Sequence, residues 1–466
     1  MKKIIVLSIK FILFSSLLLL SIFGAYRVLR WKEINAEYLS APDQMYATAD
    51  QLIDVAFVGS SHCYCGIYPS VIWEKTGISA FDVSVSGQDK DSAYHDLIEL
   101  YKTQSPKVVY VDMYALLFDE HAVESNVYRN YMALRPSVNS VRLVNAYIPE
   151  EQRRDYNLRF PIIHTRYREL QKYDFVVNPE NTYGRGAYYN FAAGGSWVNP
   201  DALNNHQIGE ISEKNRKWLN DLITLTAAHD TELVFIVIPF AIDYDQQSII
   251  NAVEKSVTEL GYRFIDFNKK LGELDLDLHT DYVDGAHLNY IGARKLSEYL
   301  ADDLSEHYTL QDHRGDKAYY QWDSDLHHYH NVLNRQALRT ADNAGAYAKT
   351  LLEYEDAYTI VSLDGEFWNR EELFDQLALL GMDYDDYLEG GKWLYHNGEL
   401  TKLMINEFGG EFRYDLSKYD TLRVGYYDAF NGMNIMIGTT GYQTTNNLCF
   451  VTYDLYLQDK VVNRGF

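Results

Sequence analysis

The stretch Val55-Ala56-Phe57-Val58-Gly59-Ser60-Ser61-His62 is an apolar run that ends abruptly in a small, hydroxyl-bearing turn. Its four apolar residues have the length and composition of a buried parallel strand, and Gly59 allows a sharp turn at the end of that strand. In open α/β sheets, ligands bind at the carboxyl ends of the strands. Ser61 is therefore a candidate nucleophile, although glycine and serine also form ordinary turns.

Strand-like and helix-like segments alternate on both sides of a long, irregular, aromatic stretch at residues 118–210. The expected strands are Val55–Val58, Phe81–Val85, Lys107–Met113, Glu232–Ile238 and Tyr262–Phe267. The expected helices are Pro69–Thr76, Ser92–Thr103, Glu213–Ala228, Gln246–Leu260 and Tyr290–Leu304. This alternation predicts an α/β domain at residues 51–310, with a parallel sheet flanked by helices. Residues 118–210 would be an insertion, either a lid or substrate wall or, as is commoner, a packing element.

The rest of the chain has a different character, as expected for 466 residues, which are too many for one typical core. Residues 311–356 are polar and helix-prone, and we expect a helical connector there. Residues 357–466 contain short alternating strands separated by glycines, which predicts a β-rich accessory domain. The connector holds His327, His328 and His330, but three histidines without a matched carboxylate or cysteine set favour a solvated helix face over a metal site. We therefore expect no metal and no cofactor.

Residues 4–26 are almost wholly apolar, interrupted by Lys10, and predict a transmembrane anchor within residues 1–30. The uncharged core at residues 11–26 is a little short, but with residues 4–9 the segment reaches the roughly 20 residues that span a bilayer. A cleaved signal peptide is the alternative, but residues 23–25 make a poor cleavage site. Basic residues flank both ends, so the positive-inside rule does not decide the orientation. Residues 31–50 are expected to form a membrane-proximal linker.

Charge and cysteine content exclude some classes of protein. The net charge is −24, and residues 1–34 hold six Lys or Arg against one Glu, which leaves −29 on the remainder. Such an acidic surface repels phosphates, so nucleic-acid binding is disfavoured. The three cysteines, Cys63, Cys65 and Cys449, support neither a disulfide framework nor a zinc site of four cysteines.

A second motif, Asp284-Gly285-Ala286-His287, lies between the last expected strand and the last expected helix of the α/β domain. A serine hydroxyl is a poor nucleophile at neutral pH and needs an imidazole base, which a carboxylate then orients. A turn can bring Asp284 and His287 to one side of the chain. Alone, the motif is better explained by a helix-capping Asp and a structural His. Because both motifs are expected at carboxyl ends of strands in one sheet, the triad interpretation is favoured.

Taken in order, Gly59-Ser60-Ser61, then Gly87 after the second strand, then Asp284 and His287 before the last helix resemble the SGNH/GDSL hydrolase superfamily. The resemblance covers about residues 50–310 and implies a flavodoxin-like sheet. It implies Ser61 as nucleophile, His287 as general base and then acid, and Asp284 as its orienting partner. It also implies that the backbone N–H groups of Ser61 and Gly87 form an oxyanion hole.

Two positions depart from the family pattern. The Asp of the first block is Ser60, and the Asn expected after the third strand has no clear counterpart. Asp112 lies nearest to that place, and a carboxylate there would oppose an oxyanion instead of donating to it. This departure puts turnover in doubt, so a non-catalytic polysaccharide-binding or scaffold protein is the alternative function.

The anchored layout, with Ser61-His62 and a long insertion, is more similar to the cell-surface branch of this superfamily. That branch assists D-alanylation of teichoic acids or O-acetylates exopolysaccharides such as alginate. The resemblance implies a single-pass membrane protein with an extracytoplasmic esterase or O-acyltransferase domain, acting on a cell-envelope polymer beside a multispanning acyltransferase. His62 would add a polar contact in the pocket, and His164 and Arg166 would hold an anionic substrate. A surface position for His62 and structural pairing for His164 and Arg166 are the alternatives.

Overall fold

The computed structural model describes residues 2–30, 41–118, 131, 134–170, 172–175, 183–363, 370–405, 411–416, 420–427, 432–443, 448–456 and 461–466. The chain divides into two compact units, Met1–Leu326 and His327–Phe466, which are described separately. The division falls inside one helix, α14 (Tyr320–Thr340), within the expected connector.

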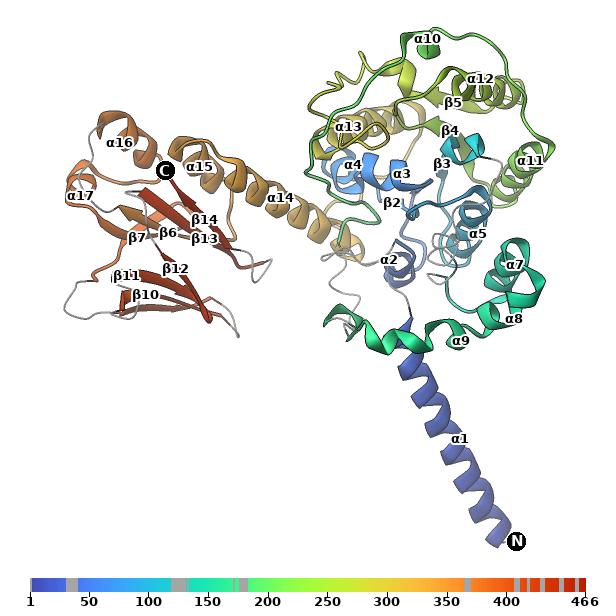
Figure 1. Cartoon of the computed structure of the whole chain (residues 1–466), viewed down its shortest axis with the longest axis horizontal. Helices are drawn as coiled ribbons and strands as arrows, with labels where there is room; N and C mark the ends of the chain where they lie inside the picture. Colours follow the sequence, from blue (N-terminus) through green and yellow to red (C-terminus); the bar gives the residue numbers. More distant parts are fainter. Residues whose placement is uncertain are drawn as a thin grey trace. The chain divides into compact units, whose positions relative to one another are not determined.

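The first unit is built on a sheet of five strands that are all parallel, in the order β2-β1-β3-β4-β5 (Figure 1). This is the strand order of flavodoxin-like doubly wound sheets. The strands are β1 (Val55–Val58), β2 (Ala80–Asp82), β3 (Val108–Asp112), β4 (Glu232–Val237) and β5 (Arg263–Asp266). The predicted parallel α/β sheet is confirmed. The second strand is shorter than expected and ends at Asp82, whose side chain accepts a hydrogen bond from the Ser84 N–H at 2.8 Å.

Helices cover both faces of the sheet (Figure 1). The connecting helices are α3 (Ser61–Gly66), α4 (Pro69–Thr76), α5 (Lys90–Leu100), α11 (Glu213–Ala227), α12 (Tyr244–Thr258) and α13 (Tyr290–His307). Short 3-10 segments follow two of the strands, at η1 (Met113–Leu117) and η5 (Phe267–Lys270). Leu97, Leu222 and Val253 pack with Val109 and Phe235 in one core, so α5, α11 and α12 share a face.

The opposite face carries α13, which packs against α3 and α4. Tyr110 of β3 donates a hydrogen bond to Asp303 of α13 at 2.7 Å, and Phe57 of β1 stacks on the Tyr110 ring. Because both faces are covered, every residue of β1 and β3 is buried. The continuous apolar run that identified β1 is the signature of such a two-sided strand.

The N-terminal helix α1 (Lys2–Leu29) protrudes from the first unit (Figure 1). Its 26-residue segment Ile4–Leu29 is long and apolar enough to cross a membrane, and most of its side chains are exposed. At 1.5 Å per residue the segment is about 39 Å long, against about 30 Å for the hydrocarbon core. Helix α2 (Ala41–Ala47) follows and buries Ala41 and Met45 in the sheet core.

The predicted insertion lies partly outside the described residues. Its described helical elements are α7 (Val138–Tyr147), α8 (Glu150–Leu158), α9 (Phe160–Ile163), η2 (His164–Arg168), η3 (Lys172–Phe175) and α10 (Pro200–Leu203). Between η3 and α10, residues 183–199 form an extended segment that we call the strap. The Asp82 N–H donates to the Arg185 carbonyl of the strap at 2.8 Å, so the strap covers the free edge of β2.

The second unit contains two antiparallel sheets, in the orders β14-β13-β6-β7-β8 and β12-β11-β10-β9. Its strands are β6 (Ala357–Leu363), β7 (Gly391–His396), β8 (Glu399–Lys402), β9 (Glu411–Asp415), β10 (Thr421–Tyr427), β11 (Gly432–Ile437), β12 (Thr440–Gln443), β13 (Leu448–Asp454) and β14 (Val461–Gly465). Ile360, Val424, Ile435 and Val451 pack between the sheets, so the unit is a β-sandwich. Its helices α15 (Ala344–Leu352), α16 (Arg370–Ala378) and α17 (Tyr384–Glu389) lie with the larger sheet. The predicted C-terminal β-rich character is confirmed.

The three connector histidines differ in environment, which corrects the expectation of a solvated face. His327 and His330 are exposed, but His328 is buried, and burial lowers its pKa to about 3. His327 contacts the Asp356 carboxylate at 2.6 Å. A buried, neutral imidazole at position 328 is part of the packing.

A buried ion pair joins the strap to the end of the sheet domain. Arg185 binds Asp325 at the start of α14, after the short helix η6 (Lys317–Tyr319). The Arg185 guanidinium also donates to Thr48 Oγ1 at 3.2 Å and lies 5.6 Å from the Trp322 ring centre. Both charged side chains are almost fully buried. The pair therefore ties together three segments that are distant in sequence.

Asp325→Ala leaves the buried Arg185 charge without its carboxylate, and we expect a loss of about 3–5 kcal/mol in unfolding free energy. Urea unfolding followed by circular dichroism measures this loss. Asp221→Ala is the matched control, since Asp221 pairs with Lys217 on the exposed surface of α11, where the loss should stay below about 1 kcal/mol. Equal losses in the two variants would contradict a structural role for the buried pair.

Candidate active site

Ser61 is the first residue of α3 and follows β1 directly through Gly59 and Ser60. Ser60 is the N-cap residue, in extended conformation, and the Cys63 N–H donates to its carbonyl at 3.0 Å. The first N–H groups of a helix have no partner within the helix. The Ser61 hydroxyl therefore lies beside backbone donors at the carboxyl end of a central strand.

The structure brings Ser61, His287 and Asp284 into one chain of hydrogen bonds. His287 Nε2 lies 2.8 Å from Ser61 Oγ, and His287 Nδ1 lies 2.9 and 3.2 Å from the two carboxylate oxygens of Asp284. These are the nucleophile-to-base and base-to-carboxylate contacts that a serine triad needs. Ser61 and His287 are separated by 226 positions in the sequence.

The loop between η5 and α13 carries Asp284 and His287 and holds both residues in place. Val283 N–H donates to the His287 carbonyl at 2.9 Å, and Tyr282 and Leu288 form a β-bridge that closes the loop. The Ala241 N–H, after β4, donates to the Gly285 carbonyl at 2.7 Å. The loop is thereby tied to the sheet.

Buried polar residues on either side of the loop hold its ends. Asn289 caps α13 by accepting from the Ile291 N–H at 3.0 Å and donates to the Thr280 carbonyl at 2.6 Å. Asp281 binds Lys295 of α13 at 2.8 Å. His287 is thus presented from a loop that is fixed at both ends.

The carboxylate of Asp284 is set up to stay ionised. Partial burial raises its pKa, but hydrogen bonds from the Ala286 N–H at 2.8 Å and from His287 outweigh that effect, so the pKa lies below its ordinary value. An ionised Asp284 holds the proton of His287 on Nδ1. This leaves Nε2 as the acceptor that faces the Ser61 hydroxyl.

His62 is buried and forms part of the wall behind the triad. Its ring stacks on Tyr114 at 3.8 Å between ring centres and meets the edges of Phe240 and His287 at 5.3 and 5.4 Å. Burial lowers the pKa of His62 to about 3, so it is neutral at physiological pH. The expected polar contact with substrate remains a prediction, and the contacts observed here are with aromatic rings and with the base.

Asp112, at the position where an Asn was expected, lies behind the nucleophile turn. A side-chain carbon at Gly59 would stand 2.8 Å from Asp112 Cβ, so only glycine fits there. Burial raises the pKa of Asp112 to about 7, although hydrogen bonds from the Ile238, Tyr114 and Met113 N–H groups act in the opposite direction and lower it. Burial likewise raises the pKa of Asp82 to about 7. Two carboxyl groups that are partly protonated at neutral pH thus flank the buried Cys63 thiol.

The remaining expected site residues differ in placement. Gly87 lies in a turn after β2 with φ +58°, a left-handed conformation that favours glycine, and its role as oxyanion donor remains a prediction.

Arg166 is buried, binds Asp174 at 3.0 Å and donates to the carbonyls of Leu29 and Arg30 at the end of α1. His164 is exposed and contacts the Pro161 carbonyl. The observed contacts of both residues are thus structural and lie outside the triad.

The strap supplies site residues that the sequence did not single out. Its Gly194 and Gly195 N–H groups donate to the Tyr282 carbonyl at 3.1 and 3.2 Å, at the start of the catalytic loop. The Trp197 ring lies directly against Gly285, where a Cβ atom would stand 2.6 Å from it. Trp197 is nevertheless 64% exposed. Glycines at 194 and 195 were the available signal, since they mark a close approach of two backbones.

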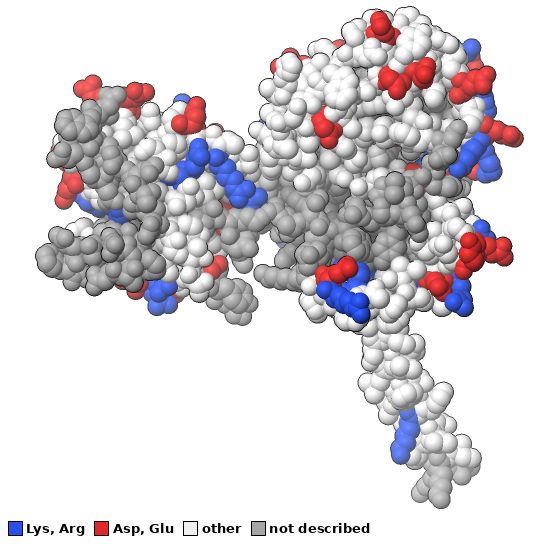
Figure 2. Space-filling model, viewed as in Figure 1, with Lys and Arg blue, Asp and Glu red and all other residues white. Residues whose placement is uncertain are grey.

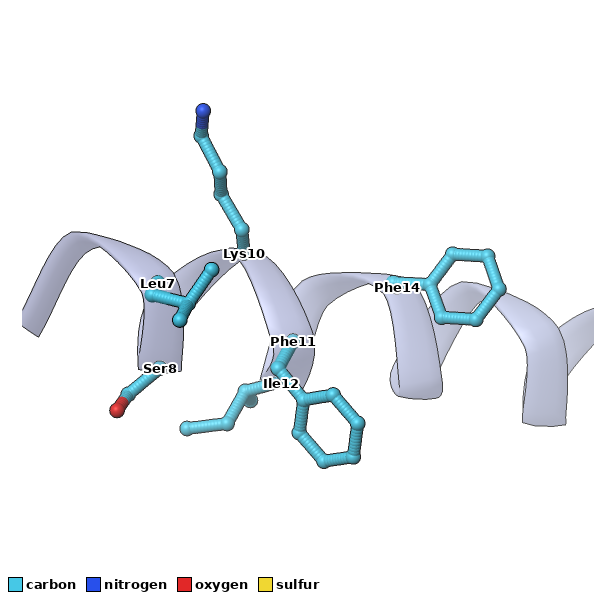
Figure 3. Close-up of a pocket in the computed structure, with 6 residues that line it drawn as sticks. All are labelled: Leu7, Ser8, Lys10, Phe11, Ile12 and Phe14. Carbon is cyan, nitrogen blue, oxygen red and sulfur yellow. The ribbon is translucent and has the colours of Figure 1, made fainter. Parts of the chain in front are cut away.

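A separate hollow lies on α1 and is lined by Leu7, Ser8, Lys10, Phe11, Ile12 and Phe14 (Figure 3). All six residues belong to successive turns of one helix, and Figure 3 shows the Lys10 side chain directed away from Phe11 and Ile12. Such a groove between side chains is expected on any isolated helix. We assign it no ligand.

No family model matches the chain, and a search of curated proteins gives no match either. The function must therefore be argued from the geometry of the site. Within the described part of the chain, no group of three or more His, Cys, Asp or Glu is arranged to hold a metal ion.

Asp112→Asn should change how stability depends on pH. An acid whose pKa is raised by folding stabilises the folded state below its unfolded pKa, near 4, and this contribution is lost as pH rises toward about 7. Between pH 5 and pH 7.5 the variant should therefore gain about 2 kcal/mol relative to wild type. Urea unfolding at both pH values measures the gain. A constant difference between the two proteins would show that Asp112 is ionised throughout this range.

Proposed function

We propose that the protein is a serine acyl-ester enzyme of SGNH/GDSL type, either an esterase or an O-acyltransferase. The observation that carries the proposal is the 2.8 Å contact between His287 Nε2 and Ser61 Oγ, with Asp284 on the other ring nitrogen. The flavodoxin-like strand order and the place of Ser61 at the end of β1 also support it.

In the proposed reaction, Ser61 Oγ attacks the carbonyl carbon of an acyl ester while His287 Nε2 accepts the hydroxyl proton. The Ser61 and Gly87 N–H groups are the expected donors to the oxyanion. When the tetrahedral intermediate collapses, His287 returns the proton to the departing alcohol oxygen, which leaves the acyl group on Ser61. Water or a sugar hydroxyl then attacks this acyl-enzyme, with His287 as the base. Esterase and transferase differ only in that acceptor.

A cell-envelope polysaccharide or teichoic acid is the proposed substrate. The exposed Trp197 of the strap, which lies against Gly285 of the catalytic loop, supports this class, because an indole ring offers a flat apolar surface against which a sugar ring can stack. An apolar N-terminal helix supports a single-pass membrane protein. The proposed position of the catalytic unit outside the cytoplasm rests on the family resemblance. A multispanning acyltransferase as partner remains part of the proposal.

A second candidate function is a non-catalytic polysaccharide-binding or scaffold protein of an envelope-modification complex. The observation that favours it is the carboxyl group of Asp112 where the family pattern has an amide donor. Labelling with a fluorophosphonate probe separates the candidates, since a scaffold protein leaves Ser61 unlabelled and an acyl-ester enzyme is labelled there.

Ser61→Ala and His287→Ala should each lower kcat for p-nitrophenyl acetate by roughly 10⁴-fold or more, because triad members act as a unit. The rate of p-nitrophenol release by the full-length protein in detergent measures the loss. Ser60→Ala is the matched control: its hydroxyl is buried without a hydrogen-bond partner, so activity should stay within about threefold of wild type. Equal rates in all four proteins would exclude the triad.

Trp197→Ala should weaken the use of a polymer and spare a small ester. We expect kcat/KM for p-nitrophenyl acetate to stay within about threefold, while acetate release from an O-acetylated polysaccharide falls by about tenfold, which corresponds to the 1.4 kcal/mol of one lost ring contact. Trp197→Tyr keeps a ring and should retain most of the polymer activity. A parallel loss on both substrates would instead show that Trp197 acts by holding the catalytic loop.

A further inference from the structure

The part of the first unit next to the end of α1 is held to that helix by specific hydrogen bonds. The buried Arg166 donates to the Leu29 and Arg30 carbonyls at 3.0 and 2.5 Å. Arg159 donates to the Tyr26 hydroxyl at 2.7 Å. Helix α9 and the 3-10 segments η2 and η3 all contact α1. The surface of residues 158–170 and 172–175 is thus fixed beside the point where the apolar helix enters the globular unit.

This surface carries large apolar side chains that face solvent. Leu158, Phe160, Tyr167 and Phe175 are 63%, 42%, 58% and 58% exposed. Their neighbours Tyr156 and Ile163 are buried in a small core with Tyr131, which also contacts Tyr26 and Leu29 of α1. The four exposed residues therefore lie on a folded platform beside the helix. We call these four residues the collar.

Basic and acidic residues accompany the collar in nearly equal numbers. Residues 150–175 contain six Lys or Arg and five Asp or Glu, whereas the chain beyond residue 34 has a net charge of −29. Arg154 and Arg168 are exposed, and the Arg168 guanidinium lies 5.4 Å from the Tyr167 ring centre. Figure 2 shows Lys and Arg beside the base of α1, next to acidic residues of the same surface. This segment is therefore close to neutral, and an anionic membrane surface repels it less than it repels the acidic remainder of the protein.

We propose that the collar is a membrane-interface surface, seated in the headgroup and upper acyl region of the leaflet from which α1 emerges. Three observations select lipid as the occupant. The collar is continuous with the apolar helix, its aromatic side chains are of the kind enriched at membrane interfaces, and its surroundings are nearly neutral on an otherwise acidic protein. The inference goes beyond the proposed catalysis and does not depend on it.

A consequence is that α1 is not a flexible tether for the first unit. The Arg166 and Arg159 bonds and the seated collar together hold the end of α1 against the segment that carries the collar.

Fluorescence quenching of the full-length protein tests the proposal in nanodiscs of phosphatidylcholine with 30% phosphatidylglycerol. Phe160→Cys, Tyr167→Cys and Phe175→Cys variants are labelled with an environment-sensitive fluorophore, and the three native cysteines are buried. Lipids that carry a nitroxide near the headgroup act as quenchers. Leu260→Cys, 62% exposed at the end of α12, is the matched control, and Ile22→Cys on α1 reports that the helix is inserted.

We expect the collar labels to lose at least half of their fluorescence and the Leu260→Cys label to lose less than a tenth. A preparation is analysed only if its Ile22→Cys label is quenched, because that quenching shows that α1 is inserted in the bilayer. Collar labels that stay as bright as the Leu260→Cys label, with Ile22→Cys quenched, overturn the proposal and leave a protein partner as the occupant of this surface. The circular dichroism spectrum of each labelled variant, compared with that of the wild-type protein, shows whether its fold is intact.

Discussion

The candidate site depends on one constraint: all five strands of the first sheet run in the same direction. Parallel strands place every carboxyl end at one edge, so residues that follow different strands meet there whatever their distance in sequence. Ser61 follows β1, and the His287 loop is tied by Gly285 to the residues that follow β4. The 2.8 Å contact between Ser61 and His287 is the result. A reversed strand at either position would carry its residues to the opposite edge.

The same edge brings several carboxyl groups into buried or partly buried positions, where ionisation costs free energy. The surrounding hydrogen bonds compensate for that cost at one of these groups and not at the others. Asp284 is partly exposed and receives hydrogen bonds, so it remains charged. Asp82 and Asp112 are fully buried, and burial favours their neutral forms. This difference in ionisation matters for the chemistry. The ionised Asp284 contacts the base His287, whereas the partly protonated Asp82 and Asp112 lie behind the nucleophile Ser61. On the proposed reading, a protonated Asp112 opposes an oxyanion less than a charged carboxylate would.

Most of the first sheet could be predicted because its strands are short apolar runs, most of which end at Gly or Asp. The Ser61 and Asp284/His287 motifs were visible because each adjoins a periodic element: Ser61 follows β1, and His287 lies just before α13. The strap was not predictable, because residues 183–199 have no periodicity and their position depends on backbone hydrogen bonds with Tyr282 and Asp82. His328 was misjudged because its burial is decided by packing in the second unit, which a run of histidines does not encode. Arg166 illustrates the same limit: its partners, Asp174 and the α1 carbonyls, are set by the tertiary fold.

The exposure of the triad bears on the size of the proposed substrate. The side chains of His287 and Asp284 are 27% and 55% exposed, and Trp197 projects beside them from a strap whose backbone is pinned by three hydrogen bonds to Tyr282 and Leu278. A small ester would find little enclosure at such an open edge and would bind weakly. A polymer, in contrast, can lie across the edge and gain contacts far from the reacting carbonyl, and such remote contacts can stabilise the transition state. An open triad with an adjoining rigid indole therefore fits an extended glycan better than a small free metabolite.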